Sequence, residues 1–411
     1  MYTKRLFKLI HYALILPNML GSTSIKLNFA EKKLYKTERS SRKFLAFLCL
    51  QTAMNFIVGW RTIGIYFSKG AHHDFYFHMC YAISFLLLMS NSCMWYAFFK
   101  IDEAIDIINQ TMAYSCKFER KWMLKSYNPD VLNCIPGRYL DAAIILSTCI
   151  VLFVPILTAA HYFYLPDLPI FLPTVLPLAE NDELWEFSLK QTNWVKLAFG
   201  CFGALFWLAT AQIFHTNFIV LAIYTASILQ LIEVEFRTNI RKLRGKWNTY
   251  SYLRCVSTLT HEYRCVEILH SKFKKFSGYL FRILNDELLH FTLCCHFILV
   301  RNWNSLDFYA KAQLAAWGFI FQFMWTTVLL ICAHFYQSSK LTLTSWDKIK
   351  CERMLDKKYM SKFSKSCRPL SFGVNGIFTI RNDTVLKFSI GVVRGTFRTL
   401  LMLERTRRRY H

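Results

Sequence analysis

The chain has 411 residues and a formal net charge of +24 at pH 7, and 54% of its residues are hydrophobic and 17% aromatic. It contains several separate runs of about 20 apolar residues, which soluble domains do not carry, so the composition indicates a polytopic helical membrane protein. Such a basic charge is also found in nucleic-acid-binding proteins. Here, however, the cations concentrate between the apolar runs, as in cytoplasmic loops, and we expect no nucleic acid as a partner.

The residue types that usually build enzyme and metal sites do not form recognisable motifs. The 14 cysteines include no Cys-x-x-Cys pair, and those inside apolar runs resemble small hydrophobic residues. Asp286 and Glu287 are adjacent and therefore point to different faces of a helix. There is no phosphate-binding glycine loop, zinc motif or nucleophile elbow. We expect no enzymatic activity, no catalytic residue, no metal, no cofactor and no disulfide framework.

The N-terminal segment is basic, with ten lysines and arginines against two glutamates in residues 1–43. An apolar patch at 7–20 follows the basic start, as in a signal peptide. It has no small-residue cleavage site, and Pro17 interrupts it. We predict a cytoplasmic or interfacial helix here.

Seven apolar runs are predicted to cross the membrane as helices, at 44–67, 75–99, 139–163, 194–229, 283–303, 308–336 and 384–403. Basic residues dominate the connections 230–282 and 337–367, whereas the acidic connection 165–191 has Lys190 as its single cation. Since cytoplasmic loops are enriched in lysine and arginine, this asymmetry places the N-terminus in the cytoplasm and the C-terminus outside. A basic C-terminal end opposes that topology, but the other loops outweigh it.

The predicted fold is an all-α membrane protein with seven transmembrane helices and a cytoplasmic helical anchor region. The expected order is a cytoplasmic N-terminal segment (1–43), helices one to four (44–229), a cytoplasmic helical extension (230–282), helices five and six (283–336), a cytoplasmic helix (337–367), the pore-lining seventh helix region (368–403) and a short extracellular tail (404–411).

The region 368–403 is the most informative part of the chain. It begins with Arg368-Pro369-Leu370-Ser371-Phe372, and its later apolar run contains Lys387, Arg394 and Arg398. Three cations are costly against lipid, so this helix should be buried among other helices or line water. Alternatively, it is a weakly hydrophobic helix that lies on the membrane surface.

The same region resembles a known family. The match runs over Cys367-Arg368-Pro369-Leu370-Ser371-Phe372, Gly376-Ile377-Phe378 and Thr384-Val385-Leu386-Lys387-Phe388. This series is similar to the run that leads into the final helix of the insect (arthropod) chemoreceptors, the odorant and gustatory receptors. Gustatory receptors place Thr-Tyr and then Gln-Phe in that helix, where this chain has Thr396-Phe397 and Leu403-Glu404. The subfamily is therefore left open, with a gustatory-like receptor preferred.

The resemblance implies a chemosensory receptor that acts as a ligand-gated, non-selective cation channel in the plasma membrane of a sensory neuron. The implied partners are a tastant or odorant, monovalent and divalent cations, membrane lipids and further subunits, in a homotetramer or a heterotetramer with a co-receptor. The final helix of each subunit would line the pore.

The pore and gate residues implied by the resemblance are Val393, Thr396, Phe397, Leu400 and Leu403. Leu400 falls at the gate, where a ring of four leucines closes a pore by dewetting. Alternatively, Leu400 packs against a neighbouring helix. Arg394 and Arg398 would repel cations inside a pore, so we expect them to face carboxylates or aqueous vestibules.

The resemblance also places a small-molecule site in the outer halves of the second, third, fourth and sixth helices. The candidate residues there are Tyr81, Phe85, Phe153, His161, Phe206, Trp207, Trp317 and Phe321. Aromatic side chains with a few polar groups line many ligand pockets. For each residue, core packing is the alternative, and His161 is alternatively an interfacial residue.

Two other classes of membrane protein are alternatives. A G-protein-coupled receptor requires an external N-terminus, and its Asp-Arg-Tyr and Asn-Pro-x-x-Tyr motifs are missing here. A membrane transporter predicts an internal repeat and a broken helix at the midplane. The two halves of the chain show no repeat, although Gly200 and Gly203 leave room for a broken helix in the fourth run.

Overall fold

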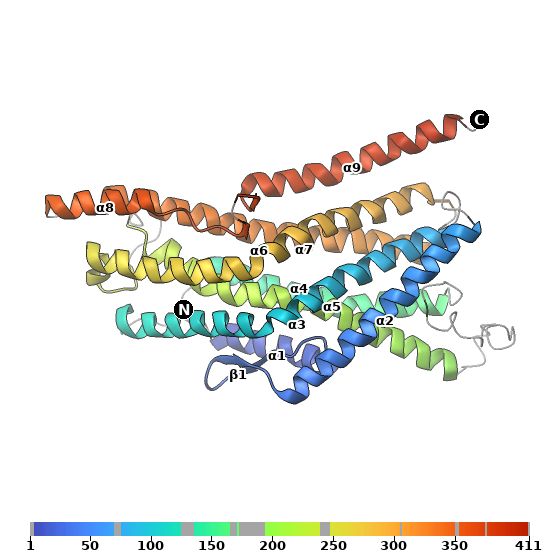
Figure 1. Ribbon diagram of the computed structural model, residues 1–411, viewed down its shortest axis with the longest axis horizontal. Coiled ribbons are helices and arrows are strands. Elements are labelled where there is room, and N and C mark those ends of the chain that lie inside the picture. Colours follow the sequence, from blue (N-terminus) through green and yellow to red (C-terminus); the bar gives the residue numbers. More distant parts are fainter. Residues whose placement is uncertain are drawn as a thin grey trace.

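The computed structural model describes residues 4–69, 75–124, 135–164, 171, 194–238, 247–304, 306–349, 353–374 and 376–409. Long helices run along the long axis of the molecule (Figure 1). They are α1 (Lys4–Leu20), α2 (Glu38–Lys69), α3 (Phe75–Trp122), α4 (Ile135–Tyr164), α5 (Trp194–Gln230), α6 (Val256–Arg301), α7 (Phe308–Ser345), α8 (Met354–Ser366) and α9 (Asn382–Arg409). A π-helical turn, Leu231–Glu235, follows α5 directly.

Six helices in the described ranges, α2 to α7, are long and apolar enough to cross a membrane. The prediction of a helical membrane protein is thereby supported, with six candidate spans instead of seven. The remaining predicted span coincides with α9, which is helical but is interrupted by Lys387, Arg394 and Arg398. Its composition alone does not qualify it as a span.

Two of the helices extend well beyond the predicted spans. α3 has 48 residues and α6 has 46. At about 1.5 Å per residue each is about 70 Å long, more than twice the hydrocarbon core of about 30 Å. In α3 the extension follows from buried residues at helical spacing, Ile101, Ala104, Ile108 and Met112, which keep one face on the core. α6 passes position 283, an expected boundary, without a break.

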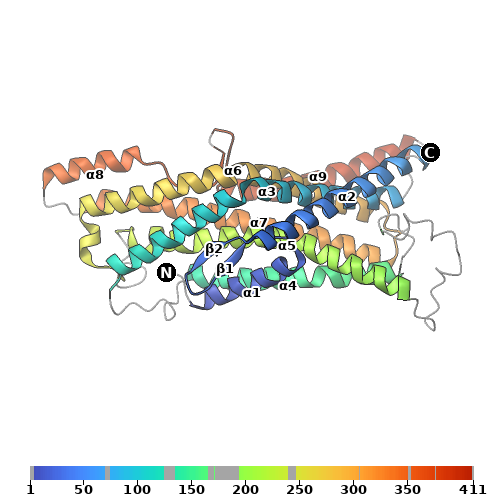
Figure 2. The ribbon, with the colours of Figure 1, turned by 60° about the horizontal axis from the view of Figure 1, so that its bottom comes forward.

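The structure adds two short antiparallel hairpins to the predicted all-α fold. One pairs β1 (Lys26–Asn28) with β2 (Lys33–Tyr35), and the other pairs β3 (Gly373–Val374) with β4 (Phe378–Thr379). Pro17, expected to interrupt the first apolar patch, lies inside α1, near its C-terminal end. Figure 2 shows α1 and the β1–β2 hairpin together along one side of the bundle.

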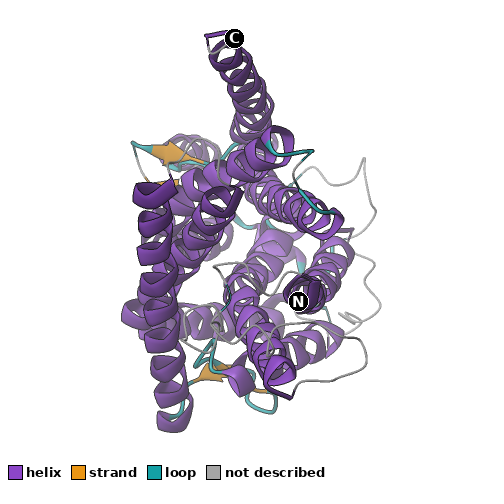
Figure 3. Cartoon of the chain, turned by 90° about the vertical axis from the view of Figure 1, so that its right-hand side faces the viewer, coloured by secondary structure: helices purple, strands orange, loops and turns teal. Residues whose placement is uncertain are grey.

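α9 lies at the edge of the molecule. It contacts α6 and α7 and projects from the bundle (Figures 1 and 3). The C-terminal end of α9 lies at the same end of the long axis as the turn between α6 and α7 (Figure 1). At that turn, the Asp307 carboxylate caps α7 by accepting hydrogen bonds from the backbone N–H groups of Tyr309 and Ala310, at 2.7 and 2.9 Å.

Candidate functional site: a central cavity and the final helix

A cavity of about 140 Å³ lies among α3, α4, α5, α6 and α7. Its lining is mainly aromatic and aliphatic, and it includes three of the predicted ligand residues, Trp207, Trp317 and Phe321. The ring centroids of Trp207 and Trp317 are 6.1 Å apart, and Phe321 meets Phe291 edge to face at 5.1 Å. Enclosed apolar walls of this kind fit a small, mostly apolar molecule.

The polar side chains in the described lining of this cavity include Thr210, His215, Asn217 and Ser277. The imidazole of His215 is held from both sides, with Nδ1 3.2 Å from Gln212 Oε1 and Nε2 3.1 Å from Thr148 Oγ1. Both ring nitrogens are thereby engaged, so His215 forms a fixed part of the cavity wall.

Sequence reasoning missed these polar residues, although a signal was present. Gln212, His215, Thr216 and Asn217 lie together in the middle of the apolar run 194–229. Polar groups at that depth in a span are expensive and tend to mark functional sites. The aromatic residues were chosen as candidate ligand residues because aromatic side chains commonly line pockets.

Two of the predicted ligand residues surround a histidine of α6 and are not among the residues that line the cavity. The Tyr81 hydroxyl lies 2.9 Å from His290 Nε2, and the ring centroid of Phe85 lies 4.6 Å from that of His290. This cluster joins α3 to α6.

The last three predicted ligand residues also lie outside the described lining. Phe206 is buried beside Trp207, with its ring 6.0 Å from that of Phe47. Phe153 is 49% exposed on α4. His161 is buried, and its ring lies 5.9 Å from Phe171. The structure therefore brings together three of the eight candidates at the central cavity.

One face of α9 is packed on α6. Phe388 and Val392 are buried on it, and Thr396 Oγ1 lies 3.1 Å from His296 Nδ1. A Cβ atom at Gly395 would lie 2.6 Å from Leu293 Cδ2, so the glycine allows the two helices to approach closely. Thr396, a candidate pore residue, thus lies on the side that faces α6.

The opposite face of α9 is exposed and apolar. Val393 is 53% and Phe397 63% exposed, and both belong to the predicted pore set. Arg394 and Arg398 are exposed as well, and neither makes an ion pair within the described ranges. The predicted residues Leu400 and Leu403 belong to α9, but their side chains lie outside the described part of the chain.

The link between the bundle and α9 is anchored by a buried aromatic cluster. Phe372 is fully buried, and its ring centroid lies 4.9 Å from Phe335, 5.3 Å from His270 and 5.7 Å from Phe281. The hydrogen bond from Ile380 N to Phe372 O, at 3.1 Å, then closes the β3–β4 hairpin that leads into α9. Phe372 therefore fixes the base of the final helix to α6 and α7.

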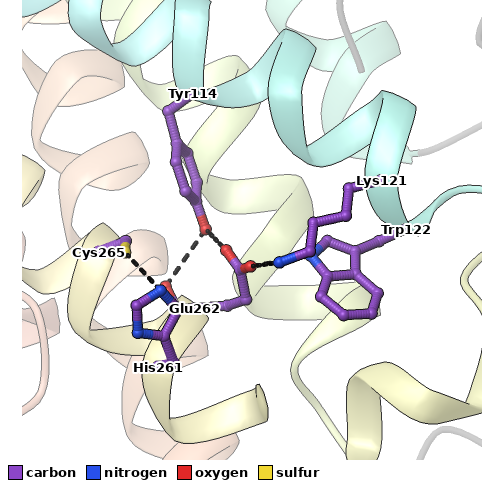
Figure 4. A network of polar contacts seen from close by, with 6 residues as sticks. All are labelled: Tyr114, Lys121, Trp122, His261, Glu262 and Cys265. Carbon is purple, nitrogen blue, oxygen red and sulfur yellow. Dashed lines mark hydrogen bonds and ion pairs between the residues drawn. The ribbon is translucent and has the colours of Figure 1, made fainter.

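A buried carboxylate joins α3 to α6 (Figure 4), in the half of the bundle where α8 lies (Figure 1). The Glu262 side chain is only 8% exposed. It accepts hydrogen bonds from the Tyr114 hydroxyl at 3.0 Å, from Trp122 Nε1 at 2.9 Å and from Lys121 Nζ at 3.4 Å. A buried charge with these partners holds the two helices in one register.

Glu262→Ala should lower the free energy of unfolding by about 2 kcal/mol, because the buried Trp122 N–H loses its acceptor at about 1–3 kcal/mol, whereas the Tyr114 hydroxyl keeps its hydrogen bond to the Glu262 carbonyl oxygen. Thermal unfolding of the purified chain in detergent, followed by intrinsic fluorescence, measures this. The control is Glu267→Ala, which removes an ion pair to the half-exposed Arg264. Exposed pairs contribute about 0–1 kcal/mol. Equal shifts for both variants would contradict the role of Glu262.

A second polar cluster closes the end of α5. The Thr249 hydroxyl donates to the buried Glu235 carboxylate at 2.7 Å, and Arg254 Nη2 donates to Thr249 Oγ1 at 2.9 Å. The Arg254 guanidinium lies 4.0 Å from the Trp247 ring centroid. Burial lowers the pKa of Arg254, and the nearby Glu235 carboxylate opposes that shift. This cluster ties the π-helical turn after α5 to residues 247–254, which precede α6.

Metal ligation has no visible basis within the described ranges. They contain no group of three or more His, Cys, Asp or Glu side chains placed to hold a metal ion. The cysteines in these ranges are free thiols.

No protein-family model matches the sequence, and no curated protein matches it. Solved structures do. The insect olfactory receptor OR5 from Machilis hrabei in complex with eugenol aligns with a TM-score of 0.61 over 96% of this chain and 98% of that chain, at 11% sequence identity. The chain has the fold of the insect olfactory receptors. A second structure of that receptor aligns with a TM-score of 0.55 over 96% and 97% of the two chains, at 12% identity. The predicted resemblance to insect chemoreceptors is thus confirmed at the level of the olfactory-receptor fold.

Proposed function

We propose that this chain is a subunit of a chemosensory receptor that acts as a ligand-gated cation channel in the plasma membrane of a sensory neuron. A small molecule binds in the central cavity, and α9 from each of four subunits lines one pore. The observation that carries this proposal is that α6 both lines the central cavity and contacts α9. Leu288 of α6 lines the cavity, and the next residue, Leu289, meets α9 at Gly391.

A second contact couples the cavity to α9. Phe273 and Phe281 of α6 line the cavity, and both pack against Phe372, with ring centroids at 5.9 and 5.7 Å. A ligand that moves these rings therefore acts on the base of the β3–β4 hairpin. Close-packed interiors transmit such small displacements because they have no spare volume to absorb them.

The exposed stripe of α9 supports its role as a pore helix. Leu400 follows Val393 by seven positions and Phe397 by three, which is helical spacing. Four such stripes facing one axis form an apolar constriction that closes by dewetting. Arg394 and Arg398 each follow a residue of this stripe, Val393 and Phe397, by one position, which is about 100° around the helix, so both side chains point away from the axis. This arrangement reconciles the arginines with cation flow.

The subunit assembles as a homotetramer, or as a heterotetramer with a co-receptor, with the N-terminus in the cytoplasm and the C-terminus outside. We place it nearer the gustatory receptors because of Thr396-Phe397. A metabotropic seven-helix receptor and a transporter are the alternatives. The first responds only through G proteins, and the second takes up substrate without a channel current, so current recordings distinguish both from a channel.

The experiment is whole-cell recording from cells that express this chain, with G-protein signalling blocked and a panel of tastants and odorants applied. Eugenol is the first probe, because the OR5 structure contains it. We expect a rapid ligand-dependent current. Current that requires an added co-receptor subunit supports the heteromeric form. A response that vanishes with the G-protein block, or substrate uptake without current, contradicts the channel.

The cavity is tested by Ala211→Phe, which fills its wall on α5. We expect at least about a tenfold rise in the half-maximal ligand concentration, equivalent to about 1.4 kcal/mol of lost binding free energy. Ala315→Phe on the exposed face of α7 is the matched control and should leave that concentration unchanged. Equal effects of the two variants would place the ligand elsewhere.

A further inference from the structure

A second cavity, of about 360 Å³, lies between α1, the β1–β2 hairpin and the first turns of α2. It shares no lining residue with the central cavity. Figure 2 shows α1 and the hairpin side by side at this part of the molecule. We call it the N-terminal cavity.

The walls of the N-terminal cavity are held by backbone contacts. Gly21 has a φ of +79°, and a Cβ atom there would lie 2.9 Å from the carbonyl oxygen of Lys43. Glycine therefore allows the chain after α1 to turn back onto α2. The Ser40 hydroxyl, on the first turn of α2, donates to Ser24 O at 3.0 Å. The cavity is thus a built feature and not a gap between loose segments.

The charges around the N-terminal cavity have one sign. Lys26, Arg39 and Lys43 line it together with His11, and no aspartate or glutamate is among its lining residues. Within the described ranges none of these three cations forms an ion pair, and Lys26 Nζ makes only a hydrogen bond of 3.3 Å to Thr37 Oγ1. Clustered cations without counter-charges create a potential that attracts an anion.

Asn18, a lining residue of the N-terminal cavity, joins two parts of its wall. The side-chain amide of Asn18 donates to the carbonyl oxygens of Leu14 and Ile25. Its buried Oδ1 accepts no hydrogen bond from the described residues, although buried polar atoms are normally paired. The two hydrogen bonds of the Asn18 amide therefore fix α1 against the chain that leads into the hairpin.

The position of the cavity matches the headgroup level of a membrane. α2 is a candidate span of 31 residues from Glu38. Its length of about 46 Å exceeds the hydrocarbon core of about 30 Å, so its basic first turns lie outside the core. Next to the cavity, α1 exposes apolar side chains, with Tyr12 and Met19 each 68% exposed. Apolar and basic groups together are typical of a helix that lies at the lipid interface.

We propose that the N-terminal cavity binds the headgroup of a phosphatidylinositol phosphate from the adjacent leaflet. Arg39, Lys43 and Lys26 contact its phosphate groups. The acyl chains lie along the exposed apolar side chains of α1. This site is separate from the chemosensory ligand site, and it ties the N-terminal segment to the membrane.

The test is binding of a short-chain phosphatidylinositol monophosphate to the purified full chain in phosphatidylcholine nanodiscs, measured by native mass spectrometry. R39Q/K43Q removes two lining cations, both exposed and outside the core. K8Q/K33Q is the control, with the same change of charge at exposed positions away from the lining. Because each surface cation contributes about 1 kcal/mol to binding anionic lipid, we expect at least about a tenfold weaker Kd for R39Q/K43Q.

The control pair should change the Kd by less than about twofold. Equal losses for both pairs would mean general charge attraction and would overturn the proposal. No binding above the phosphatidylcholine background would overturn it too. A soluble inositol phosphate that binds as tightly as the lipid would overturn the lipid as the source, because the acyl chains would then contribute nothing to binding. The readout needs no current, so failure here is distinguishable from failure of the channel proposal.

Discussion

Phe372→Ala is expected to lower the free energy of unfolding by about 3–5 kcal/mol, the range found when a buried phenylalanine is truncated in a core. Phe372 is fully buried and touches rings from three helices, with Tyr224 of α5 at 6.1 Å in addition to its partners on α6 and α7. Neighbouring rings of this size cannot all collapse into the space, so much of the cavity persists.

Thermal unfolding of the purified chain in detergent measures the effect of Phe372→Ala. Phe319→Ala on α7 is the control, since that ring is 68% exposed and its loss should shift stability by less than about 1 kcal/mol. The ligand-evoked current provides a second measurement. If Phe372 couples the cavity to α9, the variant should lose current at temperatures where it remains folded. A destabilised variant with the wild-type half-maximal concentration and full current would contradict the coupling.

The helices were predictable because their signal is local. Runs of about 20 apolar residues require no knowledge of the rest of the chain. The first four predicted spans and the sixth fall within α2 to α5 and α7, and the fifth, 283–303, ends two residues beyond α6. The extension of α3 beyond its predicted span was harder to predict. The apolar residues at 101–112 of α3 indicate a helix beyond the predicted span, and Ile107 and Ile108 are buried against other helices. Residues 113–122 carry many charges and resemble a loop in a hydropathy profile. The helical face there depends on tertiary partners.

The candidate ligand site was predicted only in part for a related reason. A sequence indicates which residues are aromatic and apolar, but not at which depth each helix meets its neighbours. Trp317 and Trp207 line the cavity because α5 and α7 meet there, with these two ring centroids 6.1 Å apart. Phe85, on α3, lies instead against His290 of α6. His215 was overlooked, although a polar residue in mid-span was itself a signal.

The orientation of α9 also required the structure. The family resemblance indicated which residues belong to the final helix, but did not distinguish the face packed on α6 from the exposed face. Gly391 and Gly395, four positions apart, mark the side of close approach to α6. Val393 and Phe397 then fall on the exposed side, while Thr396 contacts His296. The spacing of the glycines in the sequence therefore indicates the face of α9 that packs on α6. The family resemblance at Thr396, a predicted pore position, did not indicate that face.

Gly373→Ala is expected to be among the most damaging substitutions in the chain, with a loss of about 3 kcal/mol or more. Gly373 has a φ of +110°, which is strained for any residue with a Cβ atom, and the added methyl group would overlap the carbonyl oxygen of Phe378. Phe378 lies on the partner strand, so the obstacle is backbone and cannot rotate away. The hairpin must open, and α9 loses the base that Phe372 provides.

Gly376→Ala is the matched control for Gly373→Ala. Gly376 also has a positive φ, of +79°, but a Cβ atom there would meet no other atom within 4 Å. Its cost should be the backbone strain alone, about 1–2 kcal/mol. Thermal unfolding and ligand-evoked current are measured for both variants. We expect Gly376→Ala to retain current and Gly373→Ala to lose it. Only Gly373→Ala disrupts the hydrogen-bonded hairpin between the aromatic cluster and α9. Similar currents in both variants would mean that α9 is positioned by its packing on α6 alone.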